Sequence, residues 1–125
     1  MNTNIQILVV EDFKGMRKVL VGILKTIGFK KICEAENGKR AWDMIQTNHY
    51  DLVLTDLMMP EMDGMELLEQ IRTSDNQIKD TPVVMLTASY QETDIALASK
   101  WKVNGYITKP FSVKTVLSKI KELTR

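Results

Sequence analysis

The sequence predicts an α/β domain in which a doubly wound, five-stranded parallel sheet carries helices on both faces. Two observations lead to this fold class. Short apolar runs alternate along the whole chain with segments whose apolar residues recur at helical intervals. No linker, repeat or low-complexity stretch interrupts the alternation, so residues 1–125 are expected to form one domain. Right-handed crossovers between parallel strands then favour helices on both faces of the sheet.

The first two strand–helix units occupy the N-terminal part of the chain. The first strand is predicted over Ile5 to Val10, and its helix ends at Gly28, where a left-handed cap fits. A weaker strand from about Lys31 to Ala35 leads to a second helix that begins near Lys39. The apolar residues that give these helices their period are Met16, Val19, Leu20, Ile23, Leu24 and Ile27 in the first, and Ala41, Met44 and Ile45 in the second.

The third strand is predicted over Leu52 to Thr55, and its helix begins at Asp63. Glu66 stands three residues after Asp63, which is the spacing of a capping box. In that arrangement each side chain accepts a hydrogen bond from the backbone N–H of the other residue. The buried stripe of this helix is predicted to consist of Leu67, Leu68 and Ile71.

The last two units complete the alternation. The fourth strand is predicted over Pro82 to Leu86, and Ser89 with Glu92 resembles a second capping box before the fourth helix. The fifth strand covers about Gly105 to Thr108, and the last helix starts near Ser112. The apolar positions are Ile95, Ala96 and Ala98 in the fourth helix, and Val113, Val116, Leu117, Ile120 and Leu123 in the last.

Composition excludes several classes of protein. Apolar residues make up 44% and charged residues 26% of the chain, as in an ordinary globular domain. The net charge of +1 gives no electrostatic footprint for nucleic acid, and no apolar run reaches the roughly 18 residues of a membrane span. Cys33 is the single cysteine, and the N-terminus lacks the basic region of a signal peptide. We therefore expect a cytoplasmic protein that neither binds nucleic acid nor inserts into a membrane.

Polar side chains follow four of the five predicted strands. These residues are Glu11 and Asp12 after the first strand, Asp56 after the third, Thr87 after the fourth, and Lys109, followed by Pro110, after the fifth. Doubly wound sheets bind ligands outside the carboxyl ends of their strands, so we expect these side chains to meet at one edge. Three carboxylates gathered there without a cation would repel one another and raise each other's pKa values.

This set of groups suits phosphoryl transfer to a carboxylate. Mg²⁺ prefers oxygen ligands, which Glu11, Asp12 and Asp56 can supply. An aspartate can act as a covalent nucleophile and form an aspartyl phosphate, and we assign that role to Asp56. Lys109 would supply a cation, and Thr87 a hydroxyl donor, for the charge on the phosphoryl oxygens.

The chain resembles the receiver domains of two-component response regulators along its whole length. The stretches that carry the resemblance are Val9-Val10-Glu11-Asp12, Leu54-Thr55-Asp56-Leu57-Met58-Met59-Pro60-Glu61-Met62-Asp63-Gly64, Val84-Met85-Leu86-Thr87-Ala88 and Gly105-Tyr106-Ile107-Thr108-Lys109-Pro110-Phe111. Within the family the chain is most similar to the single-domain chemotaxis type, through Phe13, Met16-Arg17, Glu34-Ala35-Glu36-Asn37-Gly38 and Tyr106. The resemblance implies a flavodoxin-like fold with strand order 2-1-3-4-5 and no output domain.

The resemblance also implies how the metal and the phosphoryl group are held. Asp56 accepts the phosphoryl group from a sensor histidine kinase. Asp12, Asp56 and the backbone carbonyl of Met58 bind Mg²⁺ directly, whereas Glu11 acts largely through water. Lys109 pairs with the phosphoryl group, and the peptide bond that follows it, before a proline, is cis.

Two further residues form the implied switch. Thr87 moves toward the phosphoryl group, and Tyr106 then changes rotamer and reshapes the surface of the fourth helix, fifth strand and fifth helix. Phosphorylation would thereby control binding of an output partner such as a flagellar motor switch protein. The implied protein is a monomeric phosphoacceptor that assists its own phosphoryl transfer and dephosphorylation, rather than an enzyme.

Other interpretations stay open at this point. The chain could be a phosphorelay shuttle, a phosphate sink, or a receiver excised from a larger regulator or hybrid kinase. A Mg²⁺-dependent phosphatase of the haloacid dehalogenase type also uses an aspartate nucleophile, but it needs a second aspartate where Met58 stands. Met58 and Ser89 also occupy positions that are often polar and acidic, respectively, in the chemotaxis type. These two substitutions bear on the phosphoryl lifetime and on any phosphatase partner.

Overall fold

Five parallel strands form one sheet in the computed structural model, which describes residues 1–75, 77–88 and 92–123. The order of the strands is β2-β1-β3-β4-β5, which confirms the predicted fold class. The strands are β1 (Gln6–Val10), β2 (Lys31–Ala35), β3 (Leu52–Asp56), β4 (Val83–Thr87) and β5 (Gly105–Thr108). The helices are α1 (Lys14–Ile27), α2 (Gly38–Thr47), α3 (Gly64–Arg72), α4 (Glu92–Lys100) and α5 (Val113–Leu123), with a short 3-10 helix, η1 (Ile78–Asp80).

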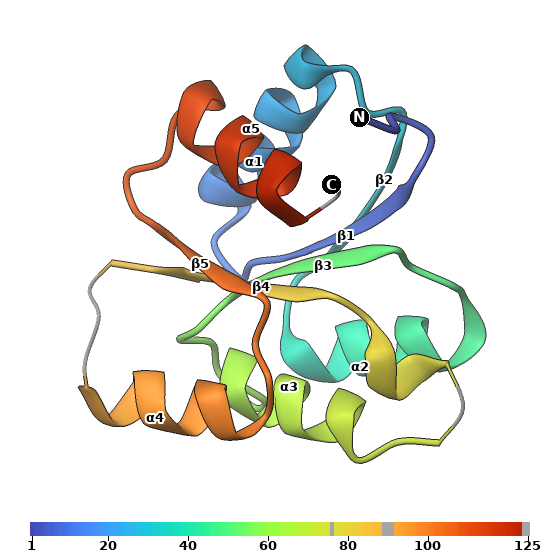
Figure 1. Ribbon diagram of the computed structural model, residues 1–125, viewed down its shortest axis with the longest axis vertical. Coiled ribbons are helices and arrows are strands. Elements are labelled where there is room, and N and C mark those ends of the chain that lie inside the picture. Colours follow the sequence, from blue (N-terminus) through green and yellow to red (C-terminus); the bar gives the residue numbers. More distant parts are fainter. Residues whose placement is uncertain (76, 89–91, 124–125) are drawn as a thin grey trace.

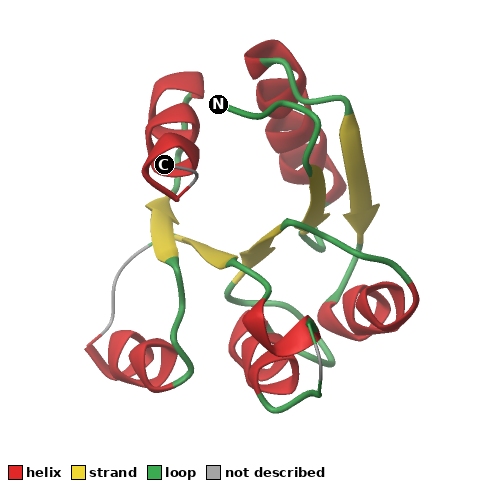
Figure 2. Ribbon diagram, turned by 45° about the vertical axis from the view of Figure 1, so that its right-hand side comes forward, coloured by secondary structure: helices red, strands yellow, loops and turns green. Residues whose placement is uncertain are grey.

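The helices lie in two layers, one on each face of the sheet. Figure 1 shows α1 and α5 on one face and α2, α3 and α4 on the other. The turned view in Figure 2 shows the same division, with the strands between the two layers. Among the described residues, no helix combines the length and the apolar character that crossing a membrane requires.

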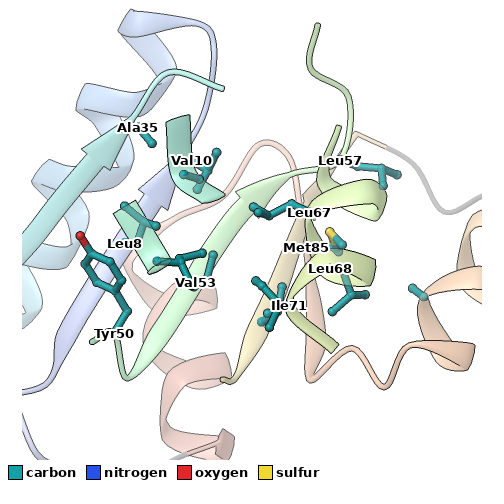
Figure 3. Close-up of a cluster of buried hydrophobic side chains, with 14 residues drawn as sticks. Leu8, Val10, Ala35, Tyr50, Val53, Leu57, Leu67, Leu68, Ile71 and Met85 are labelled. Atoms are coloured by element: carbon teal, nitrogen blue, oxygen red, sulfur yellow. The ribbon is translucent and has the colours of Figure 1, made fainter. Parts of the chain in front are cut away.

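Alternation of side chains along each central strand builds two separate hydrophobic cores. In β1, Leu8 and Val10 pack into the core beneath α2, α3 and α4, which is drawn in Figure 3, whereas Ile7 and Val9 pack into the core beneath α1 and α5. The other central strands divide their side chains in the same way, with Val53, Val83 and Met85 in the first core and Leu52, Leu54, Val84 and Leu86 in the second. Strands buried on both faces explain why the sequence reads as continuous apolar runs.

Most of the predicted helical stripes are buried against these cores. Leu67, Leu68 and Ile71 of α3 are fully buried, as are Val116 and Ile120 of α5. Four apolar residues of the predicted stripes lie outside the contact, namely Val19, Val113, and Ile95 and Ala96 of α4. Val19 of α1 is 52% exposed and Val113 of α5 is 39% exposed, because each lies at the solvent side of its stripe.

The predicted helix ends agree with the structure to within a residue. Gly28 ends α1 with φ 122°, and its N–H donates to the carbonyls of Leu24 and Lys25. Asp63 and Glu66 form the predicted capping box at the start of α3. The second helix begins at Gly38, one residue earlier than expected. The proposed cap residue Ser89 lies outside the described residues.

Side-chain hydrogen bonds hold the start of β4, at the amino ends of the strands and opposite the predicted site. Pro82 precedes the strand instead of starting it, and the Val83 N–H donates to Asn104 Oδ1 over 2.8 Å. Arg72, at the end of α3, also donates to Asn104 Oδ1. Its guanidinium donates further to four backbone carbonyls, those of Lys79, Thr81, Trp101 and Lys102. One side chain thereby joins α3, η1 and the turn between α4 and β5.

Candidate functional site

The polar residues that follow the strands lie at the carboxyl edge of the sheet, as the sequence predicts. Asp56 and Thr87 are the last residues of β3 and β4, each one residue beyond the predicted strand end. Backbone hydrogen bonds continue past the strands, because the Leu57 N–H donates to the Leu86 carbonyl and the Lys109 N–H to the Thr87 carbonyl. The backbone that carries these side chains is therefore fixed by the sheet itself.

Three carboxylates converge at this edge. One oxygen from each of Glu11, Asp12 and Asp56 lies within 4.8 Å of the others. Glu11 is 2% exposed and Asp56 6% exposed, whereas Asp12 is open to solvent. The site is thus a partly buried acidic cluster with one solvent-facing side, which is a suitable shape for a cation that keeps some of its water.

Lys109 brings the counter-charge. Its ammonium Nζ lies 3.1 Å from Asp56 Oδ1 and 3.5 Å from Glu11 Oε2, and its side chain is 20% exposed. The lysine crosses from the end of β5 to the ends of β3 and β1, so it contacts two acids from different strands. The Lys109–Pro110 peptide bond is cis, as the resemblance implies.

The two buried acids still repel each other. Burial, together with the hydrogen bond and charge of Asp56, raises the pKa of Glu11 to about 7. The Lys109 cation and the Phe13 N–H lower that pKa, but they do not cancel the other effects. Lys109 therefore neutralises the cluster only in part. A divalent cation bound to carboxylate oxygens would complete the compensation, so the donor set fits Mg²⁺.

The loop between β3 and α3 passes close to the cluster. Met58 lies two residues after Asp56 with its side chain 75% exposed, at the rim of the site. The loop is packed tightly at two glycines. A Cβ on Gly64 would meet the Asp56 carbonyl, and a Cβ on Gly38 would meet the Met62 carbonyl. The assignment of the Met58 carbonyl as a metal ligand stays a prediction.

Thr87 and Tyr106 occupy neighbouring strands. Thr87 is 7% exposed, at the end of β4, and pairs in register with Thr108. Tyr106 lies in β5 opposite Met85, and it packs against the core beneath α2, α3 and α4. Their roles as switch residues stay predictions. Ser89, whose substitution was connected with the phosphoryl lifetime, is outside the described part of the chain.

Sequence reasoning missed one residue at the site. Arg17 of α1 reaches the turn that carries Glu11 and Asp12, and its Nη1 donates to the Glu11 carbonyl over 2.8 Å. In the sequence, Arg17 stands out only as a point of family resemblance. No spacing rule predicts a side chain that binds a backbone carbonyl, because the contact depends on the conformation of the turn.

A second cluster of charged residues lies at the amino ends of the strands. Arg72, Lys79, Lys100 and Lys102 line a cavity of about 510 Å³ together with Asp80, Trp101 and Asn104. The Lys100 ammonium lies 5.2 Å from the centre of the Trp101 ring. This region holds an excess of cations, in contrast to the acidic cluster at the carboxyl edge.

Comparison with known proteins gives the same family along the chain. The family described as "Response regulator receiver domain" matches residues 7–121. Among curated proteins, the chain is similar to the chemotaxis protein CheY-3 of Vibrio cholerae serotype O1, with 39% identity over 123 residues that cover 98% of this chain and 94% of that protein.

Two solved structures have closely similar folds. Chemotaxis protein CheY4 of Vibrio cholerae superposes with a TM-score of 0.88 at 26% identity, covering 95% of this chain and 98% of that one. The receiver domain of a sensor histidine kinase from Pseudomonas aeruginosa PAO1, solved with a magnesium ion coordinated in its active-site cleft, gives a TM-score of 0.85 at 25% identity. That match covers 95% of this chain and 96% of the receiver domain.

Proposed function

Because the chain belongs to the response regulator receiver domain family, we propose that it is a phosphorylation-controlled signalling switch of the single-domain chemotaxis type. Asp56 accepts a phosphoryl group from the phosphohistidine of a sensor histidine kinase. The P–N bond of the donor breaks, a P–O bond to the Asp56 carboxylate forms, and the histidine keeps the electron pair of the broken bond. The observation that carries the proposal is Lys109 Nζ lying 3.1 Å from Asp56 Oδ1, beside two further carboxylates.

The residues at the edge divide the work of binding and positioning. Asp12, Asp56 and the Met58 carbonyl would hold Mg²⁺, with Glu11 acting through water. When bound, the ion supplies positive charge for the phosphoryl oxygens. Lys109 fixes the Asp56 carboxylate for attack and meets the new charge on the phosphoryl group. The buried position of Asp56 limits the access of water to the aspartyl phosphate.

The switch acts by a shift of population between two conformations. The Thr87 hydroxyl would donate to a phosphoryl oxygen, a contact that exists only in the phosphorylated state. Tyr106, on the adjacent strand, would adjust its packing against the α4 side of the core and so reshape the surface formed by α4, β5 and α5. Thr87 is the last residue of β4, and Tyr106 lies in the neighbouring strand β5, which belongs to this surface.

The output of the proposed switch is a binding event. The name of the Vibrio cholerae relative favours chemotaxis, and a flagellar motor switch protein is the proposed partner. We further propose that the protein acts as a monomer in the cytoplasm, and that Met58 at the rim and any phosphatase partner set the phosphoryl lifetime. Family membership places the chain with phosphoacceptor signalling proteins, not with the phosphatases considered above.

Phosphorylation by acetyl phosphate with Mg²⁺ tests the proposal. We expect wild-type protein to gain one phosphoryl group by intact mass and Asp56→Asn to gain none, while Asp56→Asn keeps the wild-type circular dichroism spectrum. Asp43→Asn is the matched control, because Asp43 is an exposed acid on α2 that does not belong to the cluster of Glu11, Asp12 and Asp56. Uptake by Asp56→Asn at the wild-type rate would show that another residue is the phosphoacceptor.

A phosphorelay role is the second candidate, since a receiver domain of a sensor histidine kinase has a closely similar fold. The two roles differ in what the phosphorylated protein binds. Wild-type protein with bound beryllofluoride and the Asp56→Asn variant can be compared as baits. Selective retention of a motor switch protein by the first bait supports chemotaxis. In a separate assay, transfer of the phosphoryl group from wild-type protein phosphorylated with acetyl phosphate to a histidine-containing protein supports the phosphorelay role instead.

A further inference from the structure

The turn after β1 is fastened to the neighbouring strand by an arginine. Arg17 Nη1 donates to the Glu11 carbonyl over 2.8 Å, and Arg17 Nε donates to Glu34 Oε1 on β2 over 3.0 Å. The Arg17 side chain is 14% exposed, so the guanidinium is largely shielded from water. One planar guanidinium therefore joins the turn, at the Glu11 carbonyl, to Glu34 on β2, which serves as its anchor.

The carbonyl that Arg17 holds lies between the two acids of the cluster. The Glu11 carbonyl belongs to the same planar peptide unit as the Asp12 N–H. Holding the carbonyl therefore fixes the plane from which both side chains leave. On the other side of Glu11, its own N–H donates to the Ala35 carbonyl over 3.1 Å. Both peptide groups of Glu11 are thus tied, directly or through Arg17, to the end of β2.

The anchor residue Glu34 is held in its ionised form. Burial opposes ionisation, but hydrogen bonds from Lys18 and Arg17 outweigh it and lower the pKa of Glu34. Lys18 Nζ binds Glu34 Oε2 over 3.0 Å, whereas Arg17 binds Oε1. Lys18 is more exposed and makes no contact with the turn among the hydrogen bonds of the described residues. The two basic residues therefore share an anchor, but only Arg17 continues to the acidic cluster.

We infer that Arg17 is a positioning residue for divalent cation binding: through the Glu11 carbonyl it orients Glu11 and Asp12 toward the shared site. The inference rests on the proposed function, because that function requires Mg²⁺ to bind beside this turn. It also makes a prediction with a definite sign. A cation near a metal site weakens metal binding by repulsion, so if charge alone mattered, loss of Arg17 would strengthen Mg²⁺ binding. Loss of a positioning contact weakens it.

Titration calorimetry with MgCl₂ measures the effect directly. We expect Arg17→Met to raise the Mg²⁺ dissociation constant about 10-fold, the usual scale for residues that orient metal ligands. Arg17→Lys should give a smaller increase. Its ammonium can keep one of the two contacts, to the Glu11 carbonyl or to Glu34, but it cannot span both. Glu34→Met should act in the same direction as Arg17→Met, because it removes the anchor. Lys18→Met is the matched control and should leave the dissociation constant within about twofold of wild type.

Phosphorylation kinetics separate positioning from general destabilisation. With acetyl phosphate as donor, Arg17→Met should need a higher Mg²⁺ concentration for half-maximal rate, while the rate at saturating Mg²⁺ stays close to wild type. If Arg17→Met does not fold, Arg17→Lys and Glu34→Met carry the same comparison. An unchanged or tighter Mg²⁺ dissociation constant in the variants, or an equal loss in Lys18→Met, overturns the inference. Failure of the wild-type protein to bind Mg²⁺ or accept a phosphoryl group would instead overturn the proposed function.

Discussion

In the metal-free protein, a proton on Glu11 relieves the repulsion between two buried carboxylates. The pKa of Glu11 is raised from 4.5 to about 7, first by burial and then by Asp56, while Asp56 keeps its ion pair with Lys109. A carboxyl group whose pKa is raised on folding binds more protons in the folded than in the unfolded state. Its contribution to stability is complete below about pH 4.5 and is lost as the pH rises through about 7.

This sign leads to a prediction for the pH dependence of metal binding. Mg²⁺ binds the ionised carboxylates, so it must displace the Glu11 proton at pH 6 but not at pH 8. The rise in Tm on adding Mg²⁺ should therefore be larger at pH 8 than at pH 6, as measured by differential scanning calorimetry. Glu11→Gln should make this rise smaller and nearly equal at the two pH values.

Glu36→Gln is the control for that measurement, because Glu36 is an exposed acid just beyond β2. It should keep the pH dependence of the wild-type protein. Equal Mg²⁺-induced rises in Tm for the wild-type protein at pH 6 and pH 8 would contradict the assignment of the raised pKa to Glu11.

At the residue scale, the sequence predicted which side chains gather but not how they contact one another. Glu11, Asp56 and Lys109 could be placed at one edge because each directly follows or ends a strand, and strand ends are readable from apolar runs. The exposed position of Asp12 and the reach of Arg17 to a carbonyl could not be predicted, since both depend on the path of a turn.

At the scale of elements, the loop between β3 and α3 is held against the start of α2. Gly38 is buried at the first turn of α2, where a Cβ would press on the Met62 carbonyl. Backbone cannot move aside as the end of a long side chain can. The close contact between Gly38 and the Met62 carbonyl therefore constrains the position of the loop that carries Met58, the proposed carbonyl ligand.

Gly38→Ala should therefore destabilise the protein by about 1–3 kcal/mol, the usual cost of overfilling a packed site. It should also weaken Mg²⁺ binding, because the displaced loop carries Met58. Urea unfolding and calorimetry with MgCl₂ measure the two effects.

Gly22→Ala is the matched control. Gly22 is an exposed residue within α1, and a Cβ there meets nothing within 4 Å. The same substitution should stabilise the protein by about 0.5–1 kcal/mol through the backbone entropy of the unfolded chain. If Gly38→Ala behaved like Gly22→Ala, the tight contact with Met62 would be wrong.

The elements themselves were predictable because every local signal agrees with the fold. Apolar runs, helical periods, the Asp63–Glu66 capping box and the Gly28 cap all point to the observed boundaries. The start of β4 differs by one residue, since Pro82 precedes the strand, and the Val83 N–H donates to the side chain of Asn104, 21 residues away in the sequence. Contacts of this kind leave no local pattern.

At the scale of the whole molecule, Arg72 joins elements that the sheet alone does not connect. Its guanidinium binds four backbone carbonyls and Asn104 Oδ1, and burial lowers its pKa, whereas the charge of Asp80 acts in the opposite direction. Removing the guanidinium would leave several carbonyls without these donors, in a region that is only partly open to water.

Arg72→Met should lower the free energy of unfolding by roughly 3 kcal/mol, on the scale of lost hydrogen bonds to a charged group. Mg²⁺ affinity should stay near wild type, since Arg72 lies at the opposite ends of the strands from the acidic cluster. Lys79→Met, which changes an exposed residue lining the same cavity, should alter stability by less than about 0.5 kcal/mol. A large loss of Mg²⁺ affinity in Arg72→Met would contradict this separation.

The net charge of +1 conceals an uneven distribution. Glu11, Asp12 and Asp56 lie beyond the carboxyl ends of the strands, and the cavity with Arg72, Lys79, Lys100 and Lys102 lies beyond the amino ends. These two groups place opposite charges at opposite ends of the strands in a nearly neutral molecule. A partner with a charged surface would turn the protein during approach, before any contact forms. Added salt should then slow association more than it speeds dissociation, even though the total charge is close to zero.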